Sequence, residues 1–278
     1  VGWHLLLCGL PDATESPMKA ALVLLLAVPG LAFAQSRDQA GAAPPRGWSV
    51  GVAVAAADSP YVGEGARILP FPMFAYEGER LFLRGISGGV HLIDSGAFQI
   101  DALVSARLDG FDIDDLSASG LAANGLDAVL LDDRDHGLDA GIGAAWSGSF
   151  GRVRLQALAD VTDTSGGHEI GLEYTYMLRS GMWTILPSAG VRWMSKDLTN
   201  YYFGTQDAEV ERGVPRYNPG SAVVPSLSVA ATRPLGERWN FLGGFTYRLL
   251  PDELSDSPLL ERNAHGVPSI FGGVSYRF

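Results

Sequence analysis

The sequence predicts an all-β protein, namely a transmembrane antiparallel up-and-down β-barrel of about 12 strands that follows a cleaved signal peptide. Apolar residues alternate with small or polar ones, with a period of two, in segment after segment between residues 48 and 278. These segments are about 10 residues long, as a tilted membrane strand requires, whereas the usual strand of a globular protein has about 5 to 6. Aromatic residues recur at segment ends, as in an interfacial girdle. They are Trp48, Tyr76, Trp146, Trp183, Trp193, Trp239, Tyr247 and Phe278.

The composition excludes several other classes of protein. Hydrophobic residues make up 47% of the 278 residues, yet no run of 18 or more apolar residues could form a transmembrane helix. The 35 glycines and 16 prolines disfavour helices and indicate many turns. A formal net charge of -11 argues against a nucleic-acid partner, which would need a basic surface.

The first residues predict export. We expect residues 1–17 to be an upstream extension and residues 18–34 a signal peptide, because Met18 and Lys19 precede an apolar stretch that ends at an Ala-x-Ala site. Residues 35–47 are polar and Pro-rich and are predicted to be a flexible periplasmic lead, and residues 48–278 the barrel. The only cysteine, Cys8, precedes the predicted cleavage site, so no disulfide is expected in the mature chain.

The strands follow in order along the mature chain. In the first, Trp48, Val50 and Val52 share one face, while Ser49 and Gly51 share the other. The same pattern predicts strands over residues 48–56, 68–77, 98–108, 138–147, 153–161, 170–179, 183–193, 223–233, 239–249 and 266–278.

Residues 79–94 decide the strand count. Read as one strand, they give an odd total of about 11; read as a hairpin turning at Ser87-Gly88, they give about 12. Both ends of such a barrel lie on the periplasmic side, which requires an even number. With 12 strands, the longer connections 58–67, 109–136, 163–167, 196–222 and 251–264 all lie outside. Ten strands are the alternative, should the short hairpin belong to a loop.

The last strand closes the barrel. Phe278 ends the chain on an aromatic, and Tyr276 lies on the same face. We interpret this ending as the signal by which the barrel assembly machinery inserts the protein, with the ring of Phe278 in the interfacial girdle.

Acidic and histidine residues offer little evidence for catalysis. Dense carboxylates in residues 109–115, 132–135 and 252–256 could hold calcium, but the EF-hand spacing is absent, and we favour solvated loops. The histidines of the mature chain, at 91, 136, 168 and 265, have no metal-ligand spacing. The strongest candidate for a catalytic group is His168 with Glu169, together with Asp160 on the preceding strand. The evidence for this candidate is weak. We therefore expect no enzyme, cofactor or metal.

Charged residues at inward positions are candidate functional residues. Besides Asp101, Arg107, Asp139, Asp160 and Arg277, the candidate lumen charges are Arg152, Arg154, Glu169, Glu173, Arg179, Arg192 and Arg248. If Arg152 and Arg154 face Glu169 and Glu173, they close a narrow lumen; in an open pore they would set ion selectivity. Both alternatives remain open.

Short stretches of the chain resemble the MipA/OmpV family of outer-membrane proteins. They are Leu69-Pro70-Phe71-Pro72 before Tyr76-Glu77-Gly78, Tyr201-Tyr202-Phe203-Gly204 before Tyr217, Trp239, Ser257-Pro258-Leu259 and the ending Ser275-Tyr276-Arg277-Phe278. The resemblance spans about residues 48–278. It implies a monomeric barrel in the outer membrane of a Gram-negative cell, in contact with lipid and lipopolysaccharide, and it supplies no catalytic residues.

The same resemblance implies a function. The member that names the family is a scaffold between a lytic murein transglycosylase and a bifunctional murein synthase, and other members are associated with adhesion or solute entry. We therefore expect a non-enzymatic scaffold or anchor for murein-synthesising and murein-hydrolysing envelope proteins. The alternative is a narrow channel for small solutes; an adhesin or a barrel enzyme is less favoured.

Overall fold

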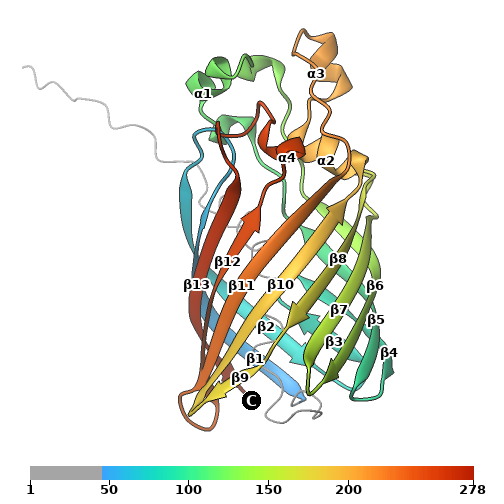
Figure 1. Ribbon diagram of the computed structural model, residues 1–278, viewed down its shortest axis with the longest axis vertical. Coiled ribbons are helices and arrows are strands. Elements are labelled where there is room, and N and C mark those ends of the chain that lie inside the picture. Colours follow the sequence, from blue (N-terminus) through green and yellow to red (C-terminus); the bar gives the residue numbers. More distant parts are fainter. Residues whose placement is uncertain (1–45) are drawn as a thin grey trace, which may run out of the picture.

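The computed structural model describes residues 46–278. The predicted extension, signal peptide and most of the periplasmic lead lie outside the described residues. Within them, the chain forms a closed antiparallel barrel, shown in Figure 1. None of the helices in this part of the chain is long and apolar enough to cross a membrane.

The barrel has twelve strand positions. The order around it is β11-β12-β13-β1-β2-β3-β4-β5-β6-β7-β8-β10, and pairing of β10 with β11 closes the ring. β9 continues β8, and both pair with β10. The strands are β1 Gly47–Asp58, β2 Ala66–Glu77, β3 Leu81–Arg84, β4 Ser87–Asp94, β5 Phe98–Arg107, β6 Gly137–Gly148, β7 Gly151–Asp160, β8 His168–Thr175, β9 Leu178–Ser180, β10 Trp183–Met194, β11 Ala222–Pro234, β12 Trp239–Leu249 and β13 Gly266–Arg277.

The predicted count of 12 strands is confirmed, and the alternative of 10 is wrong, because the hairpin β3–β4 pairs with β2 and β5 inside the sheet. Its turn lies at Gly85-Ile86 rather than at the predicted Ser87-Gly88. Arg84 pairs with Ser87, and Gly85 takes a φ of +60°, a conformation that only glycine adopts at no steric cost.

The wall has an apolar outer face and a small or polar inner face. On β1, Trp48, Val52 and Val54 are 49%, 63% and 49% exposed, whereas the alternate residues Ser49 and Ala53 are buried. A hydrocarbon environment favours this arrangement, since apolar side chains then face the lipid. Closure gives each strand position a neighbour on both sides, as a backbone in hydrocarbon requires, although β3 pairs with only three residues of β2.

Aromatic rings gather at the end of the barrel where short turns join the strands. Trp48 lies 4.9 Å from Tyr76, and Tyr276 lies 5.2 Å from both Trp239 and Phe278, measured between ring centroids. These rings come from the four adjacent strands β12, β13, β1 and β2 and from the last residue of the chain. They form the girdle that the sequence predicts at this rim.

The long connections gather at the opposite end and form a cap, seen at the top of Figure 1. We define the cap as residues 59–65, 108–136, 195–221 and 250–265. It contains the short helices α1 Ala118–Ala123, α2 Lys196–Phe203, α3 Asp207–Glu211 and α4 Asp252–Ser255, and the 3-10 turns η3 Ile113–Asp115 and η4 Ala128–Leu130.

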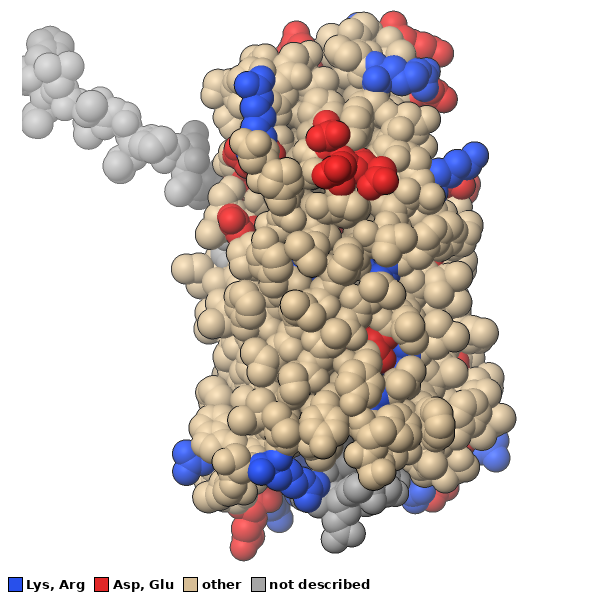
Figure 2. Space-filling view, viewed as in Figure 1, with Lys and Arg blue, Asp and Glu red and all other residues tan. Residues whose placement is uncertain are grey.

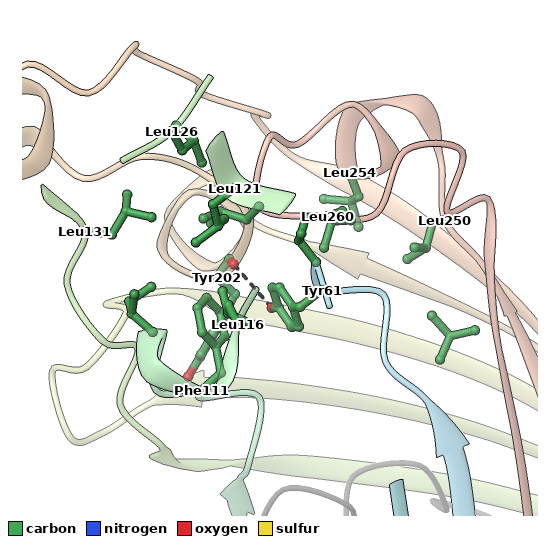
Figure 3. Close-up of a cluster of buried hydrophobic side chains, with 14 of the residues drawn as sticks. Tyr61, Phe111, Leu116, Leu121, Leu126, Leu131, Tyr202, Leu250, Leu254 and Leu260 are labelled. Atoms are coloured by element: carbon green, nitrogen blue, oxygen red, sulfur yellow. Dashed lines mark hydrogen bonds between the residues drawn. The ribbon is translucent and has the colours of Figure 1, made fainter. Parts of the chain in front are cut away.

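The cap has its own hydrophobic core, shown in Figure 3. Leu121, Leu198, Leu254 and Leu259 have no measurable exposure, although they come from three different connections. The acidic residues that the sequence predicts to be solvated, such as Asp112, Asp114 and Asp252, are exposed on the surface of this core. The apolar residues between these acidic residues pack together and hold the connections in place.

Candidate functional site in the barrel lumen

Charged side chains gather in the lumen at the outer ends of β5, β6, β8 and β10. Arg107, at the end of β5, pairs with Asp139 on β6, lies 3.0 Å from Asp109, and reaches Glu169 on β8, also at 3.0 Å. Arg192 on β10 lies 3.6 Å from the same Glu169 carboxylate. These five residues are the central lumen cluster. Because they come from β5, β6, β8 and β10, they tie together one side of the barrel wall.

A second group lies nearer the short-turn end. Nδ1 of His91 is 2.6 Å from Asp101, and its Nε2 is 3.0 Å from Glu77. Arg84 donates two hydrogen bonds to Glu77, of 2.9 and 3.0 Å, and its guanidinium lies 4.3 Å from the Phe82 ring centroid. Both His91 and Asp101 are buried. Ion pairs and hydrogen bonds of this kind offset the free-energy cost of burying charged groups inside the barrel.

Two cavities lie on either side of the central lumen cluster. The larger, of about 220 Å³, is lined by Arg107, Asp139 and Glu169, and the smaller, of about 120 Å³, by Asp109 and by Tyr61 of the cap. Arg192 lines both cavities. The cluster therefore divides the interior below the cap, as side chains fill the lumen of a barrel of modest strand number.

The predicted lumen charges occupy several different places. Arg154 faces Glu173 in the strand register, while Arg152 faces Thr175 and donates to Gln99 over 3.3 Å. Glu169 instead faces Leu158.

The remaining predicted charges divide between the lumen and the rim. Arg192 and Arg248 line the smaller cavity. Arg179 was expected in the lumen but is exposed on β9, a strand of three residues next to the turn that leads to β10. At this end of the barrel its side chain reaches water.

Sequence reasoning missed the roles of Glu77, Arg84, His91 and Gln99. Three of them belong to the hairpin and the strand end before it, where the inward face could not be assigned without the turn position. A register shift between His91 and Ile93 also breaks the period of two on β4.

The cap holds a buried ion pair. Nη1 and Nη2 of Arg134 lie 2.8 and 3.0 Å from the two carboxylate oxygens of Glu209, and neither side chain is exposed. Arg134 also donates to the carbonyls of Tyr201 and Gly204, at 2.6 and 3.2 Å. Glu209 accepts from the backbone of Asp132 and Gln206. This one pair therefore joins the connection 108–136 to the connection 195–221.

Electrostatics stabilise the base of the cap. Although burial opposes its charge, Arg107, Arg192 and Arg248 lower the pKa of Asp109. Burial lowers the pKa of His136 despite nearby carboxylates, and its Nδ1 accepts a hydrogen bond of 3.1 Å from the Gly110 N–H. Burial also raises the pKa of Tyr61, whose hydroxyl donates to the Tyr202 carbonyl over 3.3 Å. Each group thus keeps the protonation state that its hydrogen bond requires.

The candidate catalytic residues do not come together. His168 is exposed and lies 5.4 Å from Trp193, whereas its neighbour Glu169 points the opposite way, into the lumen. Asp160 accepts hydrogen bonds from Thr162, Ser165 and Gly166 within its own loop. Among residues 46–278, no group of three or more potential metal ligands is found.

The fold and the site define a class of protein. A closed barrel with an apolar outer wall, an aromatic girdle, a charged lumen and long connections at one end only is an integral protein of the bacterial outer membrane. Short turns mark the periplasmic end of such a barrel, so the cap faces outward.

The chain belongs to the MltA-interacting protein family, since the family described as MltA-interacting protein MipA matches residues 50–278. It is 28% identical over 266 residues to the MltA-interacting protein of Escherichia coli K12, covering 95% of this chain and 100% of that one. It is 29% identical over 261 residues to the outer membrane protein YiaT of the same strain, covering 92% and 98%. It also resembles the outer membrane protein OmpV of Vibrio cholerae, with 26% identity over 131 residues, 47% of this chain and 51% of that one.

Solved structures with a similar fold include an outer membrane channel from Pseudomonas putida F1. That similarity has a TM-score of 0.42 with 8% sequence identity, and it covers 87% of this chain and 99% of the channel.

Proposed function

We propose that this protein is a non-enzymatic outer-membrane barrel that anchors a murein enzyme, of the lytic transglycosylase class, at its periplasmic rim. The observation that carries the proposal is the filled interior: the cap packs around a hydrophobic core at the outer end, and the central lumen cluster occupies the lumen directly below it. A barrel filled in this way suits anchoring better than free diffusion of solutes. Relatives named MltA-interacting protein support the same role.

The periplasmic rim supports the choice of partner surface. Although the chain has a net charge of -11, arginines predominate at this end, and charges gather at the two ends of the wall in Figure 2. The rim arginines are Arg46, Arg80, Arg179, Arg233, Arg238 and Arg277, against Glu79, Asp94 and Glu237. The turns between them are short. A basic rim of this kind favours an acidic partner, through complementary charge more than through buried area.

The same features argue against catalysis. Lumen side chains such as His91, Arg107 and Glu169 are engaged in ion pairs and hydrogen bonds with partners on neighbouring strands, which is the arrangement expected of structural charges. We propose that the apolar wall binds outer-membrane lipid and that the acidic cap faces the lipopolysaccharide layer. We also propose that the barrel assembly machinery recognises Phe278 and Tyr276, and that the barrel is monomeric. A murein synthase would reach the complex through the transglycosylase.

Site-specific photocrosslinking in intact cells tests the anchoring role. A photoreactive residue at position 238, on the rim, is expected to trap a periplasmic murein enzyme, and the charge reversals R80E and R179E together should reduce the yield. A photoreactive residue at Arg216, on the cap, is the matched control and should trap none. Equal capture from the two positions, or capture of no murein enzyme from the rim, would contradict the proposal.

One observation favours a second candidate function. The two lumen cavities are lined by charged side chains, as a narrow route for small solutes would require. Passage would need both the cap and the central lumen cluster to move.

A further inference from the structure

The wall of the barrel has an opening beside β2. This strand has 12 residues, but its neighbour β3 has four and pairs only with Ala75, Tyr76 and Glu77. Within the described part of the chain, residues 66–74 therefore pair with β1 on one edge and with no strand on the other, apart from one hydrogen bond to Phe74. The tip of the hairpin β3–β4 ends well below the end of β2.

Two prolines lie on this open edge. The Phe74 carbonyl accepts a hydrogen bond of 3.2 Å from the Gly85 N–H, so the main chain of Phe74 points toward β3. Alternate residues of a strand direct their main-chain groups to the same edge, which places Pro70 and Pro72 on the open side. Proline has no N–H, so two donors that would be costly to leave unpaired in hydrocarbon are absent. The sequence of β2 therefore suits an edge that remains unpaired.

The larger lumen cavity reaches this opening. Its lining includes Pro72 and Phe74 of β2, Ile86 at the hairpin tip and Ala106 of β5, as well as Arg84 and Arg107 inside the barrel. By strand alternation, Pro72, Phe74 and Ala106 belong to the outer face, and Phe74 is 50% exposed. The cavity thus joins the lumen to the lipid-facing side of the wall.

Arginines outnumber carboxylates in the lining behind the opening. Arg84, Arg107, Arg154 and Arg192 line the cavity, against the carboxylates of Asp139 and Glu169. Nη1 of Arg84 and Nε of Arg107 are buried and find no hydrogen-bond acceptor within residues 46–278, and Oδ1 of Asp139 is buried there without a donor. A carboxylate oxygen of Asp101 lies 3.9 Å from Arg84 Nη1. Buried donors of this kind indicate room for an acceptor from outside the chain.

We propose that the opening beside β2 is a binding site for an amphiphilic carboxylate, such as a free fatty acid. Its apolar chain would lie among Phe74, Ile86 and Ala106, where the bilayer meets the wall. Its carboxylate would reach the guanidinium groups of Arg84 and Arg107, which carboxylate oxygens match in charge and geometry. The site is reached from the side, so it is accessible while the cap stays closed. It goes beyond the anchoring role and does not depend on it.

Photolabelling in lipid nanodiscs tests the site. The refolded barrel, residues 35–278, is labelled with a diazirine-bearing fatty acid, and the modified peptides are identified by mass spectrometry. We expect adducts concentrated on the segments that contain Phe74, Ile86 and Ala106, and competition by unlabelled palmitate but not by the matched fatty alcohol. No protein partner is present, so the result does not depend on the anchoring role.

Two variants make the test specific. A106W and I86W each fill the opening and should lower adduct yield at these segments by about tenfold. V229W, on the lipid-facing side of β11, is the control and should label like the original chain. Heat-modifiable gel migration shows that each variant has folded, and either filling variant is sufficient. Adducts spread evenly over the lipid-facing wall, equal competition by the alcohol, or unchanged labelling of the filled variants would overturn the proposal.

Discussion

At the scale of single residues, the ion pair between Arg134 and Glu209 governs the cap. Both side chains are completely buried, so removing one partner leaves an uncompensated charge. We expect R134M to destabilise the cap by about 3–5 kcal/mol. The expected result is rapid proteinase K cleavage in the cap of an otherwise heat-modifiable, folded barrel.

The matched control for this pair is R216M. Arg216 also pairs with a carboxylate, on Asp207, but both side chains are largely exposed, and such pairs contribute about 0–1 kcal/mol. Cleavage of R216M should therefore follow that of the original chain. If R134M resists proteinase K as well as R216M does, the buried pair does not hold the cap.

His136 makes the cap sensitive to acid. The folded protein favours the neutral imidazole, because burial lowers its pKa and Nδ1 accepts from the Gly110 N–H. The unfolded loop titrates near the ordinary pKa of about 6.5. This contribution to stability is therefore complete above about pH 6.5 and is lost as the pH falls through the lowered pKa of the folded state.

Hydrogen exchange at Gly110 is the measurement for this prediction. Exchange should accelerate, after correction for the intrinsic rate, between neutral pH and pH 5, and remain level between pH 7.5 and 8.5. In H136N, whose amide oxygen can accept the same hydrogen bond at every pH, the acid-dependent part should disappear. A pH dependence that persists in H136N would assign the effect to other groups.

Single residues also show where sequence reasoning stops. The period of two assigns inward positions to Arg107, Asp139 and Glu169, because parity within a strand is local, and in the structure Arg107 lies beside both carboxylates. It could not show that Arg107 reaches Glu169, because that contact depends on the curvature of the closed wall. His91 was not recognised, since its strand contains a register shift.

At the scale of elements, two glycines of β6 separate close strand packing from open space. A Cβ on Gly141 would lie 1.9 Å from the Ala157 carbonyl oxygen, whereas one on Gly143 would find its nearest atom at 3.6 Å. We expect G141A to lose about 1–3 kcal/mol through strain between β6 and β7, and G143A to be nearly neutral. Urea titration of the heat-modifiable folded form measures both, and equal midpoints for the two variants would refute the close approach.

The elements differ in how well the sequence predicts them. Long strands such as β6 and β10 are predicted because alternation over about 10 residues has few other interpretations. The hairpin turn is misplaced by two residues, since several small residues between Gly85 and Gly89 could each form it. The cap helices have four to eight residues and are stabilised by packing with distant connections, so local propensity does not reveal them.

At the scale of the whole molecule, barrel closure requires an even strand number and long connections at one end, which explains why the count of 12 could be predicted. Parity says nothing about how the connections fold, and the closed outer end follows from the Arg134–Glu209 pair and the leucines around it. The uneven distribution of charge also belongs to this scale. Acidic residues predominate on the surface of the cap, and arginines predominate at the periplasmic rim.

The most direct test of this account is the conductance of the refolded barrel, residues 35–278, in planar bilayers, with heat-modifiable migration confirming that it has folded. Because the cap and the central lumen cluster both close the interior, we expect a folded barrel that gives no steady current. Sustained ion-selective steps from the same preparation would contradict the closed interior and would assign Arg107, Arg192 and Glu169 to selectivity in a channel.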